Sequence, residues 1–557
     1  MRPSPHGKTL KRKSVGPALA TTPRLAAPAE RAVALNYALL GVALAVAVFS
    51  IVVFARGYSP ILFADSWKVL IEYKDAGFSF SPSSLLSFHN EHRPFMARIP
   101  ILVDQIWAGG RGWLPFGLIF LTQVAHAWLL WWIASKQPSF QHRQRLLIIA
   151  LAIFCCFSPA QMENFIWSFQ TAFLLNFLFA SAAVAAVAAQ KQNPSAHWSA
   201  VVAACACLAP LCLASGVLVW WLVVLMALAV RLPRKWVALY AVAGILTIIL
   251  FLHGYAPQDE HNKPLDALSQ PFQILLYVGY FLAASWKWWT IPFGELLAVI
   301  ASTMMLWRIG QMFRKQTHNP WEAVPPALML FSLGTGFLAA LGRIKNGIEQ
   351  AGSSRYQTPA LLFWFMAALL VVAVLPKRYE TAFGLFLMAA MVSIFPASKG
   401  IDGLVTGRRL AWDRGGAAWV SGVDDRPVLD GMFAGNQLPL RESYLQRRLG
   451  WFSVSPGSEL GSVVGVGRIQ VSNFCQGIFH RDASFLDKQW PGIRLRGFAR
   501  VRSTGEEIRE FVTATSDRLV IGVGNNGIAY AALKSDKEPL VVYGLLDQHK
   551  VCAILTD

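Results

Sequence analysis

The sequence is dominated by long stretches without a single charged residue. The first, Ala32–Ala55, is followed by comparable apolar stretches as far as Pro396. An α-helix rises about 1.5 Å per residue, so a helix over the first stretch is long enough to cross a hydrocarbon core about 30 Å thick. It is also too long for the core of a signal peptide, and we interpret it as a retained first span. The sequence therefore predicts a mainly α-helical, polytopic membrane protein.

We interpret eleven of the apolar stretches as membrane spans. They are Ala32–Ala55, Trp113–Ala134, Leu146–Phe157, Thr171–Ala189, Trp198–Leu213, Val217–Val230, Trp236–His253, Pro292–Trp307, Ala323–Leu341, Pro359–Leu375 and Thr381–Phe395. A twelfth stretch, Pro271–Ser285, is predicted to be re-entrant or interfacial. If it crossed fully, the basic cluster that begins at Arg308 would move to the outer side.

The net charge of +19 comes from basic residues that gather in a few places. One is the N-terminal tail, residues 1–31, and the others are short links between spans. These links hold Lys136/Arg143/Arg145, Arg231/Arg234/Lys235, Arg308/Arg314/Lys315 and Lys377/Arg378. Such a pattern sets membrane orientation and does not indicate a nucleic-acid partner. It places the tail in the cytoplasm, and short loops favour a bacterial inner membrane.

The chain divides into three predicted regions. Residues 1–31 form the cytoplasmic tail, and 32–397 form the transmembrane domain, with a long first outer loop at 56–100. Residues 398–557 form an extracytoplasmic, β-rich domain, because short apolar runs alternate there with turn signals such as Asn526–Gly527. This pattern favours a β-sandwich. The beginning of this region, residues 400–448, is expected to be irregular or helical.

Cysteine positions fit this division. Five of the seven lie in apolar runs, where a thiol behaves as a small hydrophobic group. Cys475 and Cys552 lie in the predicted exported domain and can pair in an oxidising compartment. The sequence alone leaves that pairing open.

Ionisable side chains interrupt the predicted outer loops. Asp65 and Glu91 are candidate catalytic carboxylates, because a general base must accept a proton from an attacking group. Basic side chains on the outer side depart from the orientation rule and need a separate reason. An arginine fork matches phosphate oxygens, so we predict that a set of residues on these loops binds the phosphate of an anionic lipid head group. The set is Arg93, Arg98, Arg355 and Tyr356.

A short turn between two spans, "SPAQMENFIWSFQ", combines an acid, an amide and aromatic rings. Sugar sites use such groups to bind hydroxyls and to stack against the ring. The predicted sugar- or acceptor-binding residues are Glu163, Asn164, Trp167, Gln170 and His92.

Each of these residues also has a structural interpretation. Asp65 can cap the helix that follows it, and Glu91 with Arg93 can form a solvated pair. Arg355 can anchor a span at the head groups. Glu163 can be a structural carboxylate, although burying one between spans is costly.

A metal site is not predicted. His89 and His92 are spaced as HxxH, which by itself is a weak ligand pattern. Asp65 and Glu91 can share a divalent cation only if the fold brings them together, so no cofactor is assigned.

Three of these features resemble the GT-C class of membrane glycosyltransferases. "FADSW" supplies an acidic residue, Asp65, soon after the first span, and "NEHRP" supplies a charged, proline-containing element before the next helix. "SRYQTP" is similar to the Arg-Tyr-x-x-Pro element that leads into a late span, as Arg355, Tyr356 and Pro359. The paired acidic dipeptide of many members is absent beside Asp65, and "HRP" stands where "KPP" or "HPP" is usual.

The resemblance implies sugar transfer from a polyprenyl-phosphate-linked donor to a cell-envelope glycan or glycolipid acceptor on the outer side. Asp65 would act as the base, while the arginines would hold the donor phosphate. Three other functions stay open: an envelope polysaccharide polymerase or ligase, a transporter or flippase of glycolipids, and a scaffold that displays the β-domain.

Overall fold

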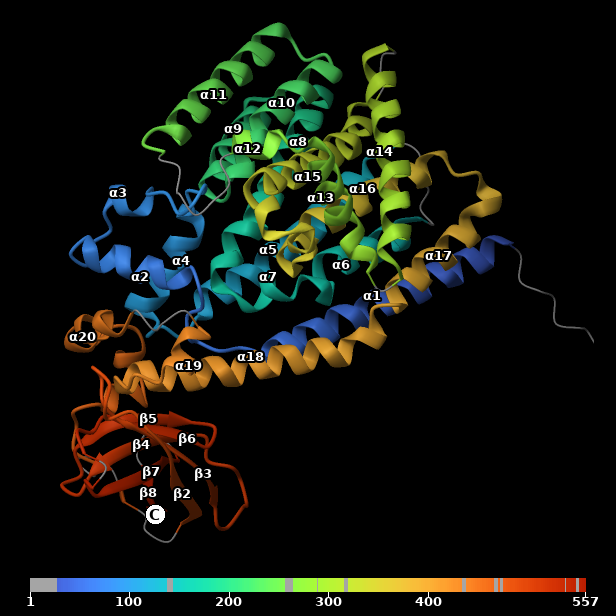
Figure 1. The fold of residues 1–557 in the computed structure, drawn as a ribbon. Helices are drawn as coiled ribbons and strands as arrows, with labels where there is room; N and C mark the ends of the chain where they lie inside the picture. Colours follow the sequence, from blue (N-terminus) through green and yellow to red (C-terminus); the bar gives the residue numbers. More distant parts are fainter. Residues whose placement is uncertain are drawn as a thin grey trace, which may run out of the picture.

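The computed structural model describes residues 28–137, 144–255, 264–287, 289–314, 319–432, 437–464, 469–470, 474–535, 537–546 and 550–556. The described chain is mainly helical, and a β-region follows the helices (Figure 1). The predicted basic tail, residues 1–31, lies outside the described residues except for 28–31, which begin the first helix. Arg143 and Lys315 of the predicted basic links also lie outside them.

The helices of the bundle and its loops are α1 Pro28–Arg56, α2 Ser66–Asp75, α3 Pro82–Leu85, α4 Phe95–Trp107, α5 Trp113–Ser135, α6 Arg145–Phe157, α7 Met162–Ile166, α8 Thr171–Gln192, α9 Ala196–Leu208, α10 Leu218–Ala229, α11 Arg234–Leu252, α12 Pro264–Leu268, α13 Pro271–Ala283, α14 Ile291–Arg314, α15 Val324–Arg343, α16 Gln357–Val374 and α17 Glu380–Val392.

Eight helical segments among the described residues are long and apolar enough to cross a membrane. They are Val33–Arg56, Trp113–Ser135, Arg145–Ile166, Ser168–Gln192, Arg234–Leu252, Ile291–Arg314, Pro320–Asn346 and Ser354–Val374. Shorter apolar helices cover Ala196–Leu211, Ala214–Ala229 and Pro271–Trp286. The chain thus has the helices of a membrane protein, and the number of eleven spans stays a prediction.

Helix α8 forms the centre of the bundle. Most of its alanine-rich half is buried, and Ala180, Ala183 and Val184 are completely so. Small side chains let neighbouring helices approach closely, which is how helices associate where lipid provides no hydrophobic driving force. Helices α11 and α14 lie at the periphery and leave most of their apolar surface uncovered. In a membrane protein that surface faces lipid.

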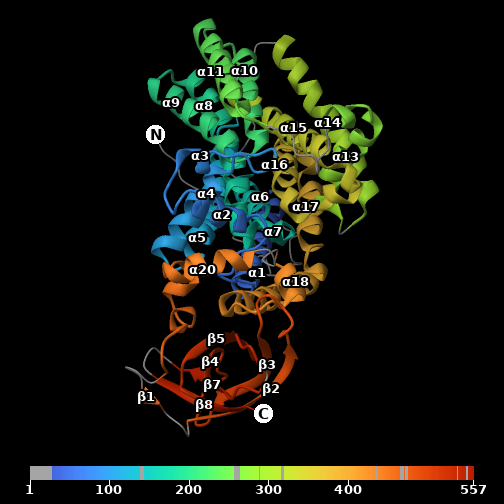
Figure 2. The ribbon, with the colours of Figure 1, turned by 60° about the vertical axis from the view of Figure 1, so that its left-hand side comes forward.

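A long helix connects the bundle to the β-region. Helix α18, Phe395–Ser421, runs beside α1 and leads to the shorter helices α19, Arg426–Asp430, and α20, Leu438–Gln446 (Figures 1 and 2). The predicted domain boundary at residue 397 therefore falls inside a helix. Asp413 of α18 accepts hydrogen bonds from Ser59 at 2.8 Å and from Asn526 of the β-region at 3.2 Å.

The β-region consists of eight strands: β1 Ile469–Gln470, β2 Cys475–Ser484, β3 Ile493–Val501, β4 Glu510–Thr515, β5 Val520–Asn525, β6 Ile528–Ala531, β7 Leu540–Leu545 and β8 Lys550–Thr556. Their order is β1-β8-β2-β3-β6-β5-β4-β7, and β7 also pairs with β8. The sheet therefore curls back on itself, and two packed sheets, as in a sandwich, do not form. The reason is that β8 has partners at both of its edges.

Two local features of this region follow the sequence closely. Asn526 and Gly527 both have positive φ and form the tight turn between β5 and β6, as an Asn-Gly pair favours. Cys475 and Cys552 form a disulfide between β2 and β8. Strand β2 was not predicted, because the run His480, Arg481 and Asp482 hides its apolar alternation.

Candidate functional site

A cavity of about 260 Å³ lies at the end of the bundle where α1 ends and α8 and α16 begin. Six separate segments contribute to its wall. The lining residues are Asp65, His89, Asn90, Glu91, His92, Trp167, Phe169, Gln170, Ala172, Phe173, Leu213, Ala214, Ser215, Thr335, Leu338, Ala339, Arg343, Arg355 and Tyr356. Residues from the first loop and from the "SRYQTP" element, almost 300 positions apart, thus meet at one site.

The "HNEH" sequence forms a tight turn at the cavity. The backbone N–H of His89 donates to the carbonyl of His92 at 2.8 Å, and the N–H of His92 donates to the carbonyl of His89 at 3.0 Å. Asn90 has a φ of 53°, a left-handed conformation that asparagine tolerates better than most residues. This turn is the reason that His89, Glu91 and His92 all reach the cavity.

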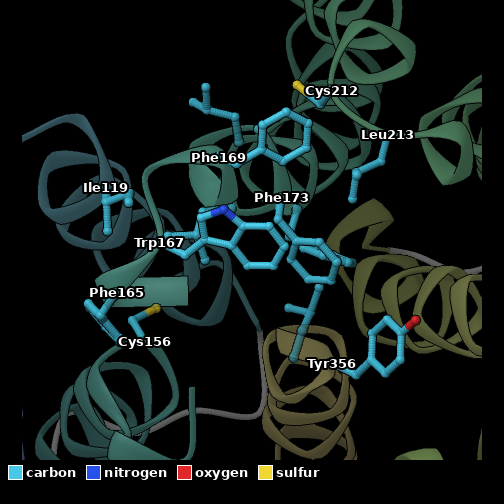
Figure 3. Close-up of a cluster of buried hydrophobic side chains, with 14 of the residues drawn as sticks. Ile119, Cys156, Phe165, Trp167, Phe169, Phe173, Cys212, Leu213 and Tyr356 are labelled. Carbon is cyan, nitrogen blue, oxygen red and sulfur yellow. The ribbon is translucent and has the colours of Figure 1, made fainter. Parts of the chain in front are cut away.

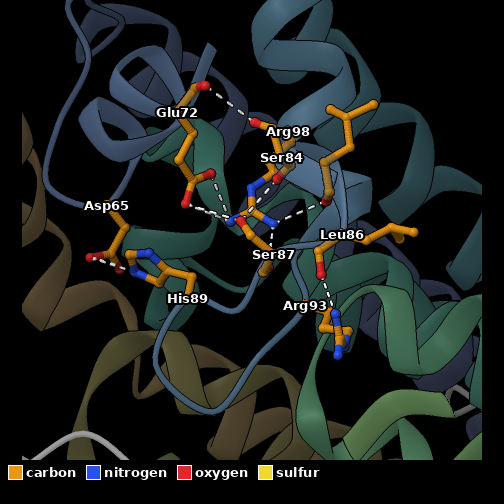
Figure 4. Close-up of polar contacts among 9 residues, drawn as sticks. Asp65, Glu72, Ser84, Leu86, Ser87, His89, Arg93 and Arg98 are labelled. Carbon is orange, nitrogen blue, oxygen red and sulfur yellow. Dashed lines mark hydrogen bonds and ion pairs between the residues drawn. The ribbon is translucent and has the colours of Figure 1, made fainter. Parts of the chain in front are cut away.

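Asp65 faces the cavity and does not cap the helix behind it. It occupies the N-cap position of α2, yet its side chain makes no capping hydrogen bond. Its Oδ1 instead lies 3.1 Å from Nε2 of His89, as Figure 4 shows. Burial alone would raise the pKa of Asp65, but His89, Arg355 and His92 together outweigh this effect and hold the pKa below its usual value. Asp65 is therefore ionised at neutral pH.

Glu91 pairs with Arg343 at the end of α15. The Nη2 atom of Arg343 donates to Oε1 of Glu91 at 2.9 Å, and Nε2 of His92 lies 3.4 Å from the same oxygen. The backbone N–H of Ala214 donates to Nδ1 of His92 at 3.1 Å. Burial lowers the pKa of His92, so at pH 7 its ring is neutral with the proton on Nε2. These contacts tie the first loop to two other segments of the bundle.

Arg355 and Tyr356 form the opposite side of the cavity. They belong to the 3₁₀ turn Ser354–Tyr356, directly before α16. The guanidinium carbon of Arg355 lies 5.4 Å from the centre of the Tyr356 ring. Within the described ranges, no carboxylate oxygen lies within 4.0 Å of the Arg355 guanidinium, whereas Arg343 is already paired. Arg355 is therefore the cavity arginine that is available to an anionic ligand.

Glu163 and Asn164 lie behind Arg355 and do not line the cavity. Oε2 of Glu163 accepts hydrogen bonds from the Ser353 hydroxyl at 3.0 Å and from the Arg355 backbone N–H at 3.2 Å. Nδ2 of the buried Asn164 donates to the Arg355 carbonyl at 3.0 Å and to the Thr358 hydroxyl at 2.8 Å. Both side chains, predicted as sugar ligands, thus hold the backbone of the "SRYQTP" element.

An aromatic wall completes the cavity. The rings of Trp167 and Phe169 are stacked with centroids 6.1 Å apart, and Phe173 lies 6.4 Å from Tyr356 (Figure 3). The indole N–H of Trp167 and the side-chain oxygen of the adjoining Gln170 are buried, and neither has a hydrogen-bond partner in the described part of the chain. Such orphaned groups are uncommon in proteins and call for an explanation.

Two predicted phosphate ligands lie away from the cavity. Arg93 donates to the backbone carbonyls of Leu86, Phe251 and His253, which fastens the first loop to the end of α11. The buried Arg98 forms an ion pair with Glu72 at 2.8 Å and also donates to two carbonyls of the same loop (Figure 4). Both guanidiniums are thus engaged in holding the loop in place.

A metal ion finds few ligands at this site. Across the residues that the structure describes, no group of three His, Cys, Asp or Glu side chains is suited to a metal ion. Asp65 and Glu91 both line the cavity, but His89 and Arg343 are their respective partners. A divalent cation shared by the two carboxylates stays an untested prediction.

Sequence reasoning missed part of the site. Arg343 was not assigned to the site, because its partner Glu91 is 252 positions away. Phe169 and Phe173 have no signal that separates a cavity wall from an ordinary apolar core. His89 was considered only as part of the weak HxxH pattern, and its contact with Asp65 could not be predicted from the sequence.

No protein-family model, no curated protein and no solved structure matches this chain. Its activity must therefore be inferred from the geometry of the cavity.

Proposed function

We propose that the chain is a membrane glycosyltransferase that moves one sugar from a polyprenyl-phosphate-linked donor to a cell-envelope glycan or glycolipid on the outer side of the membrane. The observation that carries this proposal is the meeting of Asp65, Glu91, Arg343 and Arg355 around one aromatic-walled cavity at the end of the bundle. Paired charges beside an apolar ring platform are what a phosphorylated sugar requires.

The proposed reaction is a displacement at the anomeric carbon. A hydroxyl of the acceptor attacks this carbon, the bond to the phosphate oxygen breaks, and the hydroxyl proton passes to Asp65. The polyprenyl phosphate leaves with the bonding electron pair, and Arg355 stabilises the charge that develops on it. Glu91 holds Arg343 at the rim of the cavity, where the second guanidinium adds to the positive potential. Asp65 is suited to its role because its lowered pKa keeps it deprotonated.

The cavity favours a single sugar over an oligosaccharide. Its volume of about 260 Å³ is below the roughly 300–1,000 Å³ that drug-sized ligands occupy. Hydroxyls of one ring would relieve the orphaned groups of Trp167 and Gln170 after a small side-chain movement. The two carboxylates and two guanidiniums of the lining balance, which suits the single charge of a phosphodiester better than the two charges of a pyrophosphate. These points favour the proposal over a polymerase or ligase.

A transporter is less well supported. A transport path needs polar groups through the middle of the bundle. The second large cavity, between α6, α14, α16 and α17, is instead lined almost entirely by apolar side chains such as Phe154, Trp364 and Phe386.

The decisive test replaces the proposed base. Asp65→Asn keeps the shape of the side chain but cannot accept the proton, so transfer should fall by about 10²–10⁴-fold. Transfer is measured with membranes and radiolabelled polyprenyl-phosphate sugars, and mass spectrometry of the product reports whether one sugar is added. The matched control is Asp75→Asn, an exposed carboxylate at the end of α2 that pairs only with its neighbour Lys74. Full transfer by a folded, membrane-inserted Asp65→Asn variant would refute the role of Asp65 and the function built on it.

A further inference from the structure

The turn that carries Glu163 and Asn164 makes five hydrogen bonds to the "SRYQTP" element and to Ser353 directly before it. Two bonds from Glu163 go to Ser353 and to the Arg355 N–H, and two bonds from Asn164 go to the Arg355 carbonyl and to Thr358. The Ser354 hydroxyl also accepts from the backbone N–H of Glu163 at 3.3 Å. Both peptide groups that flank the Arg355 Cα are therefore held by side chains of α7.

These contacts argue against a role of Glu163 and Asn164 in sugar binding. Asn164 is completely buried, and its amide is already shared between the Arg355 carbonyl and the Thr358 hydroxyl. Glu163 faces Arg355 from behind, and Arg408 of α18 approaches its other oxygen at 3.9 Å. Neither side chain belongs to the cavity wall.

We propose that Glu163 and Asn164 are positioning residues that fix the backbone of Arg355, and so set the affinity of the site for the phosphate of a polyprenyl monophosphate. This inference rests on the proposed function, because it assumes that Arg355 binds that phosphate. It gives Glu163 and Asn164 a positioning role in place of the sugar-binding role that the sequence predicted.

The physical reason is the precision that phosphate recognition demands. A binding group must be held within about 0.5 Å of its productive position, and a displacement of about 1 Å caused from outside the chemistry can cost about 10²-fold. Arg355 is on a 3₁₀ turn, which is short and has poorer hydrogen-bond geometry than an α-helix. A turn of this kind needs external bonds to keep a single conformation, and α7 supplies them.

The inference is tested by binding of polyprenyl monophosphate without any sugar to the purified full-length chain in detergent. Glu163→Ala removes both hydrogen bonds that the Glu163 side chain accepts. Binding should weaken by about tenfold or more, up to the roughly 10²-fold loss that a displacement of a binding group by about 1 Å can cause. Glu163→Gln retains a side-chain oxygen that can accept from Ser353 and from the Arg355 N–H, and should restore binding to within about threefold of the wild type. A purely electrostatic role of Glu163 would not be rescued by glutamine.

The matched control is Glu322→Ala. Glu322 is a half-buried carboxylate that pairs with Arg308 at 3.1 Å before α15, at the opposite end of that helix from Arg343. This variant loses an ion pair of the same kind and should bind polyprenyl monophosphate as the wild type does. Ser353→Ala, which removes one of the two Glu163 contacts, is the milder variant if Glu163→Ala does not fold, and should weaken binding about threefold.

The possible outcomes distinguish a failure of the positioning role from a failure of the proposed function. If the wild type does not bind polyprenyl monophosphate, the proposed function fails. If the wild type binds and a folded Glu163→Ala variant binds equally well, or Glu163→Gln is as impaired as Glu163→Ala, the positioning role is wrong while the function stands. If Glu163→Ala does not fold and Ser353→Ala binds as tightly as the wild type, the positioning role is likewise wrong.

Discussion

Two cavities of the bundle are almost equal in size and opposite in chemistry. One, of about 260 Å³, is the polar cavity at the end of the bundle, lined by Asp65, Glu91, Arg343 and Arg355. The other, of about 230 Å³, lies between α6, α14, α16 and α17 and is lined by aromatic and aliphatic side chains, with Ser158 and Ser285 among its few polar residues. Volume therefore does not distinguish the cavity that we propose as the reaction site, and the chemistry of its lining does.

The two cavities differ in how much their linings cost the stability of the fold. An apolar cavity beside lipid costs little, because lipid tails are as apolar as its wall. The polar cavity gathers four charged side chains, whose desolvation is costly even when they are paired. Arg343 and Glu91 satisfy each other, but no carboxylate among the described residues lies within 4.0 Å of the Arg355 guanidinium. Such an arrangement supports the proposal that Arg355 binds an anionic group of a ligand.

Apart from the replacement of Asp65, the largest expected effect comes from removing the cation of Arg355. Arg355→Ala should lower kcat/KM for transfer by about 10²–10³-fold, the loss typical of one group that stabilises developing charge. Arg355→Lys keeps the charge but not the fork, and should recover part of the activity. Near-normal transfer by a folded Arg355→Ala variant would contradict the contrast between the two cavities, because it would show that transfer does not depend on the charge of Arg355.

A pH series sharpens the role of the side chains that hold down the pKa of Asp65, which are His89, Arg355 and His92. Since the pKa of Asp65 is depressed in the folded chain, its ionised form stabilises the fold above the unfolded pKa, and this contribution disappears only as pH falls through the lower, folded value. Transfer by the wild type should therefore not decline through Asp65 between pH 7 and pH 5. His89→Gln removes the imidazole that lies 3.1 Å from Asp65 and helps to hold its pKa down, so the pKa of Asp65 should rise and transfer should begin to decline at a higher pH than in the wild type. Identical pH profiles would show that His89 does not tune Asp65.

The smallest effect is expected in the apolar cavity. Ala301→Leu adds volume to its wall and should cost about 1–3 kcal/mol of stability at most, read as a lower melting temperature. Transfer by the folded variant should change by less than about threefold. A tenfold loss of transfer without a loss of stability would show that the apolar cavity takes part in the reaction. The contrast between the two cavities would then be wrong.

Much of the fold followed from local sequence. Uncharged stretches such as Ala32–Ala55 predicted the apolar helices, since a helix satisfies its own backbone in lipid. Asn526–Gly527 predicted a hairpin turn, because only a few residues adopt its backbone conformation easily. Asp65, Glu91, Arg355 and Tyr356 were identified as candidates because charges on the outer loops need a reason.

What the sequence alone determined is therefore the kind of protein and the residues available for chemistry. Helix formation, membrane insertion and tight turns depend on neighbours a few positions apart, and these are visible in a single chain. Only the tertiary structure decided which arginine is engaged and which is free: Arg98 is committed to Glu72 and Arg343 to Glu91, and Glu163 holds the backbone of Arg355 from behind. Most of these pairings join positions that are far apart along the chain. They exist only because helix packing brings their loops to one end of the bundle.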